Sequence, residues 1–427
     1  MKHSLLKALV IGIISTVLVI PFTFTELYRA LELRFYDQRL KLRPLRPVTD
    51  KVVLIAIDDE SIKTLGRWPW SRDRHAILID TLTSLDAKGI FLDIEFLEES
   101  PSTLEKTVVA NSLKEVKEGL QHLQSISAPA KMEQAVSPAQ MVSSFLKETR
   151  VMEKTLEGML RDYDKELARS IALSGRTYLA FHPVEPLPRD SSLRPLYPSI
   201  KKILIQESAT NVESLSERLS LKKKRVKELR EYLPFLKKQI LLEWVEGEME
   251  KNPGITLEGL ETTLARSGTG EVGEAYRKAR LMRYVEERFG KEIKIIGPFP
   301  GGQPHSVPYL EVPISPLLEV SKGIGHTAIV SDREDGVVRG LPLLVQRNGR
   351  YFPNLALEAV CDYLEVGDGG LALYPGRYLS LHPASVGEIK IPVNPSGQAL
   401  VNFAGRPGHL GWSSSFSTIS YLLPLEL

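Results

Sequence analysis

The feature that most constrains this chain is an apolar stretch that ends in two carboxylates. Residues 52–57 read VVLIAI, and Asp58 and Asp59 follow at once. A short, continuous and β-branched apolar run is typical of a strand buried on both faces of a parallel sheet. A helix is predicted from an N-cap at Ser71 to about Asp86, and IFLDIEF (90–96) predicts a second buried strand. We therefore expect a right-handed β-α-β unit over this region.

The same alternation of helices and strands returns further along the chain. DYDKELARSIALSG (162–175) predicts an amphipathic helix closed by Gly175, and TYLAFHP (177–183) predicts a third strand. The pattern resumes near residue 292. The predicted fold class is α/β, with a mostly parallel central sheet, flanking helices and an added layer of antiparallel hairpins. Three hairpin turns are expected, at Asp335-Gly336, Asn348-Gly349 and Pro395-Ser396-Gly397.

Two polar, helical stretches interrupt this pattern, at about 101–160 and 206–291. In the second, Pro234 is expected to kink or end a helix. Its apolar residues recur at heptad-like spacing, with Lys222 in one core position. They fit a helical hairpin packed on its own domain or a coiled-coil contact with a second copy, and the broken heptads favour the hairpin. These residues are Val212, Leu215, Leu219, Val226, Leu229, Leu233, Leu236 and Ile240.

Composition excludes few functional classes. The 427 residues are enough for two or three domains, and the formal net charge of +2 gives no reason to expect a nucleic-acid partner. Cys361 is the single cysteine, so neither an intrachain disulfide nor a cysteine-based zinc site is possible. This suits the cytosol and equally a periplasm. No cofactor, metal or catalytic residue is predicted.

The N-terminus predicts a membrane anchor. MKHSLLK is followed by an uncharged apolar run over residues 8–25, and ~18–20 such residues can just span a hydrocarbon core. No small-residue cleavage site follows, so we expect an uncleaved transmembrane helix over 5–25 and a juxtamembrane helix over 26–46, rather than a signal peptide or a buried helix. Basic residues lie on both sides and leave the orientation in conflict. These are Lys2, Lys7, Arg29, Arg34, Arg39, Lys41, Arg43 and Arg46.

The carboxylates admit two interpretations. Asp58 and Asp59, with Asp93 in the neighbouring strand, end strands where open α/β sheets bind ligands. In the simpler interpretation Asp58 caps a turn, Arg72 is its ion-pair partner, and the two tryptophans pack in the core. In the other, carboxylates, an arginine fork and an aromatic wall form a ligand pocket. The candidate ligand-binding residues are Asp58, Asp59, Trp70, Arg72 and Asp93, with Asp335 and Arg339 as weaker members.

Several catalytic families are excluded by their motifs. A response-regulator receiver would pass directly from its acidic pair into a helix, whereas a loop containing LGRWPW follows here. A haloacid-type phosphatase needs a second aspartate two residues after the first, and that position is Glu60. No GxxxxGK[ST], HExxH or GxSxG motif occurs, and the eight histidines have no metal-ligand spacing.

Residues 52–96 resemble the opening of the CHASE domain of the second class, the cyclases/histidine kinases associated sensory extracellular domain. The family pattern is a strand ending in Ile-Asp-[Asp/Glu]-x-Ser, then Leu-Gly-x-Trp-Pro-Trp-x-Arg, a helix and a Phe-Asp-Ile-x-Phe strand. LELRFYDQRLKLRP is similar to the family's juxtamembrane segment. Further similar phrases follow in the family's order: DYDKELARSIALSG, GIGHTAIVSDREDGVVRGLPLLV, FPNLALEAV and VNFAGRP.

The resemblance implies an extracytoplasmic sensor domain over 47–427, held at the inner membrane by the N-terminal helix. It also implies a homodimer and an output module, such as a nucleotide cyclase, a histidine kinase or a serine/threonine kinase. The stimulus is not implied. Two departures stand out: the helical stretches are longer than the family pattern, and the chain stops at FSTISYLLPLEL, before an expected Val-Leu-Ile-Gly strand. We therefore expect a C-terminally incomplete sensor domain.

Two further hypotheses stay open beside the sensor. The chain could be a membrane-anchored hydrolase or phosphotransfer enzyme that uses Asp58, Asp59 and Asp93 with a divalent metal. It could also be a dimerisation scaffold that acts through residues 206–291. Metal-dependent turnover would support the enzyme, whereas saturable binding without turnover would support the sensor.

Overall fold

The computed structural model divides into two compact units. Unit 1 comprises Met1–Gly66, Pro183–Tyr309 and His326–Leu427, and unit 2 comprises Arg67–His182 and Leu310–Gly325. The residues that the structure describes are 12–13, 15–17, 19–23, 25–42, 49–100, 103–104, 114–115, 117–118, 147, 160–188, 191–207, 210–264, 270–299, 306–331, 335–401 and 416–421.

Unit 2 is built around strand β5 (Thr177–Val184). β2 (Ile90–Leu92) pairs with β5 in parallel, with Ile90 opposite Thr177. β7 (Tyr309–Glu311) and β8 (Gly323–His326) join the same sheet through β5. β5 is apolar at almost every position, which suits a strand with neighbours on both sides.

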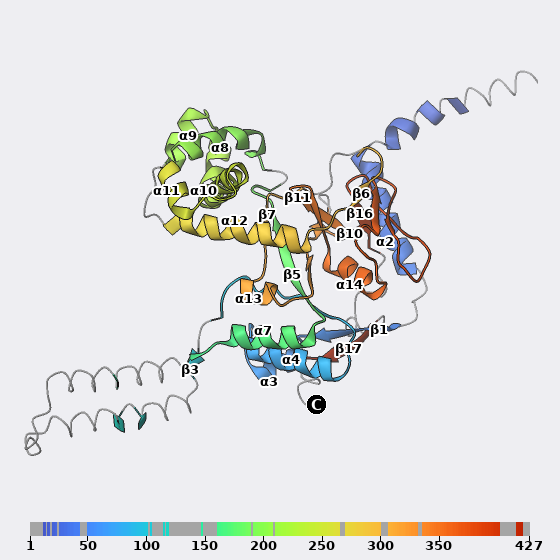
Figure 1. Cartoon of the computed structure of the whole chain (residues 1–427). Helices are drawn as coiled ribbons and strands as arrows, with labels where there is room; N and C mark the ends of the chain where they lie inside the picture. Colours follow the sequence, from blue (N-terminus) through green and yellow to red (C-terminus); the bar gives the residue numbers. More distant parts are fainter. Residues whose placement is uncertain are drawn as a thin grey trace, which may run out of the picture. The chain divides into compact units, whose positions relative to one another are not determined.

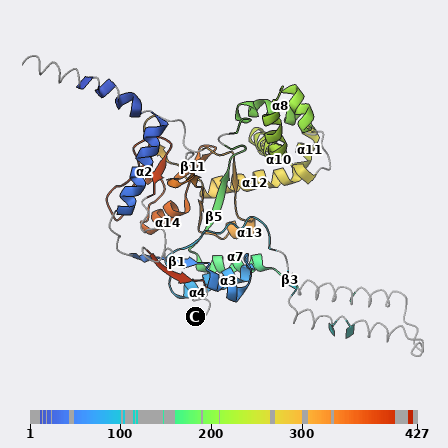
Figure 2. The ribbon, with the colours of Figure 1, turned by 180° about the vertical axis from the view of Figure 1, so that it is seen from behind.

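Two helices of unit 2 lie side by side, as both ribbon views show (Figures 1 and 2). α4 (Arg72–Ser84) has Ser71 at its N-cap, as predicted. α7 (Tyr163–Ser174) begins at Asp162, whose side chain accepts from the Lys165 N–H, and ends at Gly175 with a left-handed φ of 59°. The core of this unit includes Leu78, Ile79, Leu167, Ile171, Leu179 and Phe181. The short elements α13 (Ser315–Leu318), β3 (Thr103–Leu104) and β4 (Leu160–Arg161) complete it.

The predicted β-α-β unit over 52–96 is wrong in its strand pairing. β1 (Thr49–Ala56) pairs in parallel with β17 (Phe416–Ser420), whereas β2 pairs with β5. The parallel neighbours β2 and β5 are joined by a crossover that contains α7, whereas the prediction placed α4 in the crossover. The region after β1 was expected to be a loop, but it contains helix α3 (Asp59–Leu65). IFLDIEF is also shorter as a strand than expected, since β2 ends at Leu92.

Unit 1 contains several small sheets rather than one large sheet. β6 (Lys294–Ile295), β13 (Leu371–Tyr374), β14 (Tyr378–Leu381) and β15 (Ile389–Pro392) form one sheet. β9 (Val330–Ser331), β10 (Val338–Pro342) and β16 (Gln398–Leu400) form another, and β11 (Leu344–Arg347) and β12 (Arg350–Pro353) form a hairpin beside α14 (Leu355–Tyr363). The fold is therefore mixed α/β, as predicted, but the described residues form several sheets with parallel and antiparallel pairs in place of one mostly parallel central sheet with added hairpins.

All three predicted turns are present, but the turn at Gly397 joins strands of two different sheets rather than the two strands of a hairpin. Asn348 and Gly349 both have positive φ, at 47° and 79°, as a two-residue hairpin turn requires, and they join β11 to β12. Gly336, with φ 72°, turns between β9 and β10. The turn at Gly397 also forms, but β15 pairs with β14 and β16 pairs with β10, so these two strands are not a hairpin.

The region 206–291 is a set of helices that pack on one another within unit 1. They follow α8 (Tyr197–Gln206) and comprise α9 (Val212–Arg218), α10 (Lys223–Lys251), α11 (Leu257–Thr263) and α12 (Gly270–Phe289). α10 does not end at Pro234 but continues through it. Leu215, Leu229, Leu233, Leu236 and Ile240 are buried against one another and against α8. The heptad leucines thus face an intrachain core, as a hairpin packed on its own domain requires.

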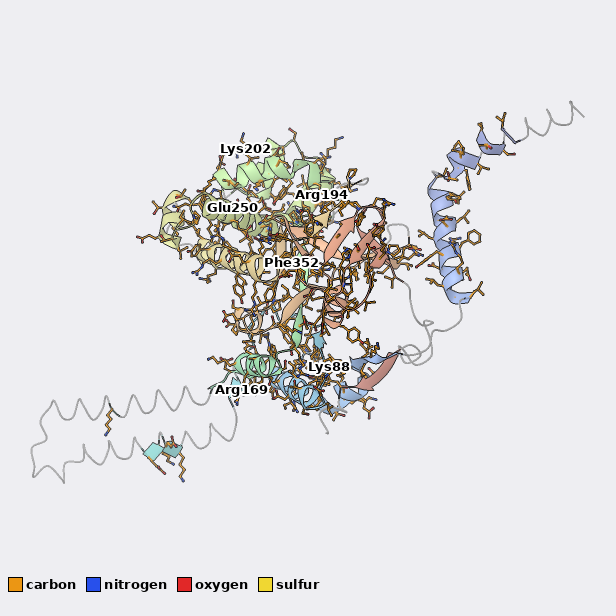
Figure 3. All side chains as sticks on the ribbon, turned by 45° about the vertical axis from the view of Figure 1, so that its right-hand side comes forward. Lys88, Arg169, Arg194, Lys202, Glu250 and Phe352 are labelled. Atoms are coloured by element: carbon orange, nitrogen blue, oxygen red, sulfur yellow. The ribbon has the colours of Figure 1, made fainter. Side chains whose placement is uncertain are left out.

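An ion-pair cluster joins these helices to the β11–β12 hairpin. The guanidinium of Arg347, at the end of β11, donates to Glu246 of α10 at 2.5 Å and to the Pro308 carbonyl at 2.9 Å, and it also pairs with Glu286 of α12. The Arg347 side chain is only 2% exposed. We call this cluster the Arg347 anchor. Figure 3 shows neighbouring Phe352 of β12 inside the body of unit 1 and Lys202 of α8 at the surface of the helical region.

The predicted membrane anchor falls partly on residues outside the described set, which begins at residue 12 and has gaps at 14, 18 and 24. Among the described residues, no helix is both long and apolar enough to cross a membrane. The juxtamembrane helix is present as α2 (Glu26–Leu42). The stretch expected to form the first helical insertion, 101–160, also lies mostly outside the described residues.

Candidate functional site

The acidic pair that ends β1 begins helix α3. Asp58 is the N-cap residue, and its Oδ1 accepts from the Ser61 N–H at 2.8 Å and from the Ser61 hydroxyl at 2.5 Å. Ser61 is buried, whereas Asp59 is exposed in the first turn of the helix. Asp59 suits that position because a carboxylate is favourable near a helix N-terminus. The turn-capping interpretation of Asp58 is thus present in the structure, although the turn it caps opens a helix.

The WPW loop of unit 2 forms an aromatic cluster. The rings of Trp68 and Trp70 meet edge to face at 5.2 Å between centroids, and Trp68 contacts His75 at 5.7 Å. His75 in turn contacts Phe96 at 5.6 Å. Trp70, His75 and Phe96 are all buried. The loop therefore packs on the first turn of α4, as core packing of the tryptophans requires.

Arg72 closes this cluster on its polar side. Its guanidinium lies 5.0 Å from the centroid of the Phe96 ring, pairs with Asp164 of α7 at 3.0 Å, and donates to the Glu98 carbonyl. Asp164 also accepts from the Ser100 N–H at 2.8 Å. Burial lowers the pKa of Arg72, and the charge of Asp164 opposes that effect. The expected ion pair of Arg72 with Asp58 is replaced by one with Asp164, which ties α4 to α7 and to the segment after β2.

In this cluster, the pKa of His75 is shifted furthest from its ordinary value. Burial lowers its pKa to about 4, and the nearby charge of Arg72 acts in the same direction, against Asp73. The imidazole is therefore neutral at physiological pH. It packs as an aromatic ring between Trp68 and Phe96 rather than as a cation.

A second polar cluster lies in unit 1, on the turn before β10. Arg339 donates to both carboxylate oxygens of Asp37, at 2.9 and 2.7 Å, and to both oxygens of Asp335, at 2.9 and 2.6 Å. The Arg339 side chain is 5% exposed. Its hydrogen bonds lower the pKa of Asp335 to about 2 and lower that of Asp37 as well. We call these three residues the Arg339 clamp.

The clamp fixes helix α2 to the body of unit 1. Asp37 belongs to α2, and its neighbour Tyr36 donates from its hydroxyl to the Val401 carbonyl at 3.0 Å. Bidentate arginine–carboxylate pairs hold orientation as well as position. The juxtamembrane helix is therefore attached, through two adjacent residues, to β10 and to the chain that follows β16.

The seven predicted site residues fall into separate groups. Asp335 and Arg339 are brought together, and Trp70 and Arg72 line the same aromatic cluster. Asp58 and Asp59 belong to unit 1 and Asp93, which is exposed, to unit 2. A pocket shared by all of them stays a prediction. Sequence reasoning missed Asp37 and Asp164. Both lie in phrases that resemble the family, Asp37 in LELRFYDQRLKLRP and Asp164 in DYDKELARSIALSG, but nothing local marks either carboxylate as the partner of its arginine.

Comparison with known proteins gives one decisive result. The model of the CHASE2 domain family matches residues 14–424, which is nearly the whole chain. The chain belongs to the CHASE2 family. CHASE2 domains are extracellular sensory domains rather than catalytic ones. Comparison with curated proteins and with solved structures gave no match.

The metal-dependent alternative finds no support in this CHASE2 domain. Within the described part of the chain, no group of three or more histidine, cysteine, aspartate or glutamate side chains is arranged to hold a metal ion. Three of the acidic side chains have protein partners instead: Asp58 binds Ser61, Asp164 pairs with Arg72, and Asp335 binds Arg339.

The cap interpretation of Asp58 gives a direct prediction. Replacing Asp58 by alanine should lower the free energy of unfolding by about 1 kcal/mol, because α3 loses its side-chain cap. Asn or Ser at this position should retain most of the stability, since both also accept from the backbone. Urea unfolding of the three variants, with Asp59→Ala as the matched exposed control, measures the difference. Equal losses in Asp58→Ala and Asp58→Ser would contradict a capping role.

Proposed function

We propose that this chain is the extracytoplasmic input domain of a membrane-anchored signal-transduction receptor. Family membership carries the proposal, because CHASE2 domains are sensory. The output, a nucleotide cyclase or a protein kinase, would lie on the other side of the inner membrane and act as a dimer. In this proposal the apolar N-terminal segment anchors the chain, and the main domain is periplasmic. Trp70, Arg72, Asp93 and the Asp58–Asp59 pair remain candidate ligand-binding residues for an unidentified stimulus.

The Arg339 clamp supports a mechanism for this proposal. A stimulus biases an output only if it binds two arrangements of the receptor with different affinities. The clamp joins the turn before β10 to α2, the helix that follows the proposed anchor. A rearrangement of that turn would therefore displace α2, and α2 would pass the displacement toward the membrane.

Location is the first point to test. Alkaline phosphatase, which folds only outside the cytoplasm, would be joined after Leu427, and a cytoplasmic fluorescent protein would be joined there in a matched chain. The proposal expects phosphatase activity that sediments with membranes and is lost when residues 1–25 are deleted, because the chain then stays in the cytoplasm. Fluorescence with no phosphatase activity would place the domain inside the cell and overturn the proposal.

The clamp gives a second prediction. Arg339→Gln keeps a polar side chain but loses the charge and the fork geometry, so α2 should detach from β10. Amide hydrogen exchange over residues 26–42 should accelerate at least about ten-fold, because the helix then opens locally without unfolding the domain. Arg350→Gln is the matched control, since Arg350 pairs with Glu292 at the surface. Unchanged protection of α2 in Arg339→Gln would show that the clamp does not hold the helix.

A further inference from the structure

The outward face of α2 carries an apolar stripe. Leu27, Leu31, Phe35 and Leu42 are 63%, 37%, 64% and 81% exposed. At 3.6 residues per turn, or about 100° per residue, these four positions fall within about 80° of one another around the helix axis. They therefore lie along one side of the helix, where exposed Gln38 interrupts them, rather than at scattered positions. Single exposed apolar residues need no explanation, but an aligned set on one helix does.

The stripe cannot turn inward, because the opposite face is already fixed. Five half-buried residues of α2 lie on the other side of the helix, and half-buried Tyr28 lies beside the stripe; the five are Ala30, Leu33, Tyr36, Asp37 and Leu40. Two of them make the bonds to Arg339 and to the Val401 carbonyl. Rotating the helix to hide the stripe would break both contacts. Something outside the described chain is therefore needed to cover it.

The charges beside the stripe favour a negatively charged partner. Arg34 and Lys41 flank one edge, and Arg39 and Glu32 flank the other, all of them exposed. In a parallel pair of helices, residues on one edge of the seam face those on the opposite edge of the partner. A second copy would bring three cations and one anion together from each chain, which is unfavourable. Apolar side chains bordered by Arg and Lys are typical of helices that lie in an anionic lipid interface.

The residues before α2 point the same way. The described positions between 12 and 23 are helical, and they expose Ile13, Val17, Val19 and Ile20 by 53–63%. Exposed apolar residues thus also precede the stripe in the chain. We propose that α2 lies on an anionic lipid surface, with Leu27, Leu31, Phe35 and Leu42 in the headgroup region and the three flanking cations on lipid phosphates. The Arg339 clamp would then hold the sensor body at a set orientation to the bilayer.

This inference rests on the membrane anchoring proposed above, and one experiment separates the two. The full chain with Phe35→Cys carries an environment-sensitive fluorophore at position 35 and is reconstituted into vesicles of phosphatidylglycerol and phosphatidylcholine. Val386→Cys, at an exposed site of unit 1, is the matched control. Native Cys361 is 3% exposed, and burial raises its thiol pKa to about 11, so it should label slowly.

A quencher attached to the lipid headgroup region reports contact. The label at position 35 should be quenched at least about two-fold more than the label at 386. The difference should shrink at high salt and when Arg34 and Arg39 are both replaced by glutamine. A chain that fails to float with vesicles would overturn the anchoring and this inference together. A chain that floats with equal quenching at both sites overturns this inference alone, and disulfide formation between two copies at Cys-substituted position 35 would identify a second copy as the occupant.

Discussion

Replacing Arg347 by methionine is expected to lower the free energy of unfolding by about 3–5 kcal/mol. The substitution keeps a flexible, unbranched stem, although a shorter one, and removes the cation that Glu246 and Glu286 share. Those two carboxylates are only 18% and 17% exposed. Without Arg347, both would be largely buried charges that have lost their shared cation, and Glu286 would keep only the hydrogen bond from the Asn348 amide. Removing one partner of a buried ion pair is costly for this reason. Urea unfolding monitored by circular dichroism measures the loss.

The pH dependence of this variant tests the cause. Burial raises the pKa of Glu246 above its ordinary value, and Arg347 opposes that rise. Removing Arg347 should raise the pKa further. A carboxyl whose folded-state pKa is raised binds more protons in the folded state, so its contribution is fully present below the unfolded-state pKa and is lost as the pH rises through the folded-state pKa. Measured against the parent chain at each pH, Arg347→Met should therefore recover stability between pH 7.5 and pH 5.

Two comparisons make the result specific. Glu246→Gln added to Arg347→Met should restore part of the lost stability, because it removes one uncompensated charge. Arg350→Met, which breaks a surface pair with Glu292, should cost less than about 1 kcal/mol. An equal loss in Arg350→Met, or no recovery at pH 5, would rule out a charge effect at the Arg347 anchor.

Acid should destabilise unit 2 through His75. Its pKa is lowered to about 4 in the folded state, against an ordinary value of 6.5. The unfolded chain therefore binds a proton over that interval that the folded chain does not, and stability falls as the pH drops from about 6.5 toward 4. The full effect is about 3 kcal/mol, because each pKa unit corresponds to about 1.4 kcal/mol.

Hydrogen exchange in α4 and α7 isolates this effect from unit 1. The parent chain should lose protection in both helices between pH 6.5 and pH 4.5, after correction for intrinsic exchange. His75→Phe, which keeps an aromatic ring between Trp68 and Phe96, should lose much less. His182→Gln, at an exposed site, is the control. The same acid-induced loss in His75→Phe would show that another group is responsible.

Local sequence signals predicted local structure well. Asp162 and Gly175 bracket α7 because a side-chain acceptor and a left-handed glycine are what helix ends require. Asn348-Gly349 makes a hairpin turn because both positions need positive φ. These outcomes depend on neighbouring residues alone, so the sequence contains all the information they need.

Pairings between distant segments were not predictable in the same way. The sequence VVLIAI does not indicate that its strand pairs with β17 rather than with β2, because one short apolar strand resembles another in composition. The same holds for charges. Arg72 was expected to pair with a carboxylate and does, but the carboxylate is Asp164 on another helix. The family resemblance, by contrast, was confirmed, because the WPW loop and the DGVVR turn are specific phrases rather than periodic patterns.

The contacts made by α2 join residues that are far apart in sequence, and this separation affects how the chain folds during synthesis. Asp37 and Arg339 are 302 residues apart in sequence, and Tyr36 and Val401 are 365 apart. A ribosome that adds about 5–20 residues per second needs about 15–60 s to reach Arg339 after Asp37. During that interval α2 is already outside the ribosome without its attachment site. Nascent chains arrested before residue 339 should therefore present α2 to chaperones or translocation factors, and released full-length chains should not.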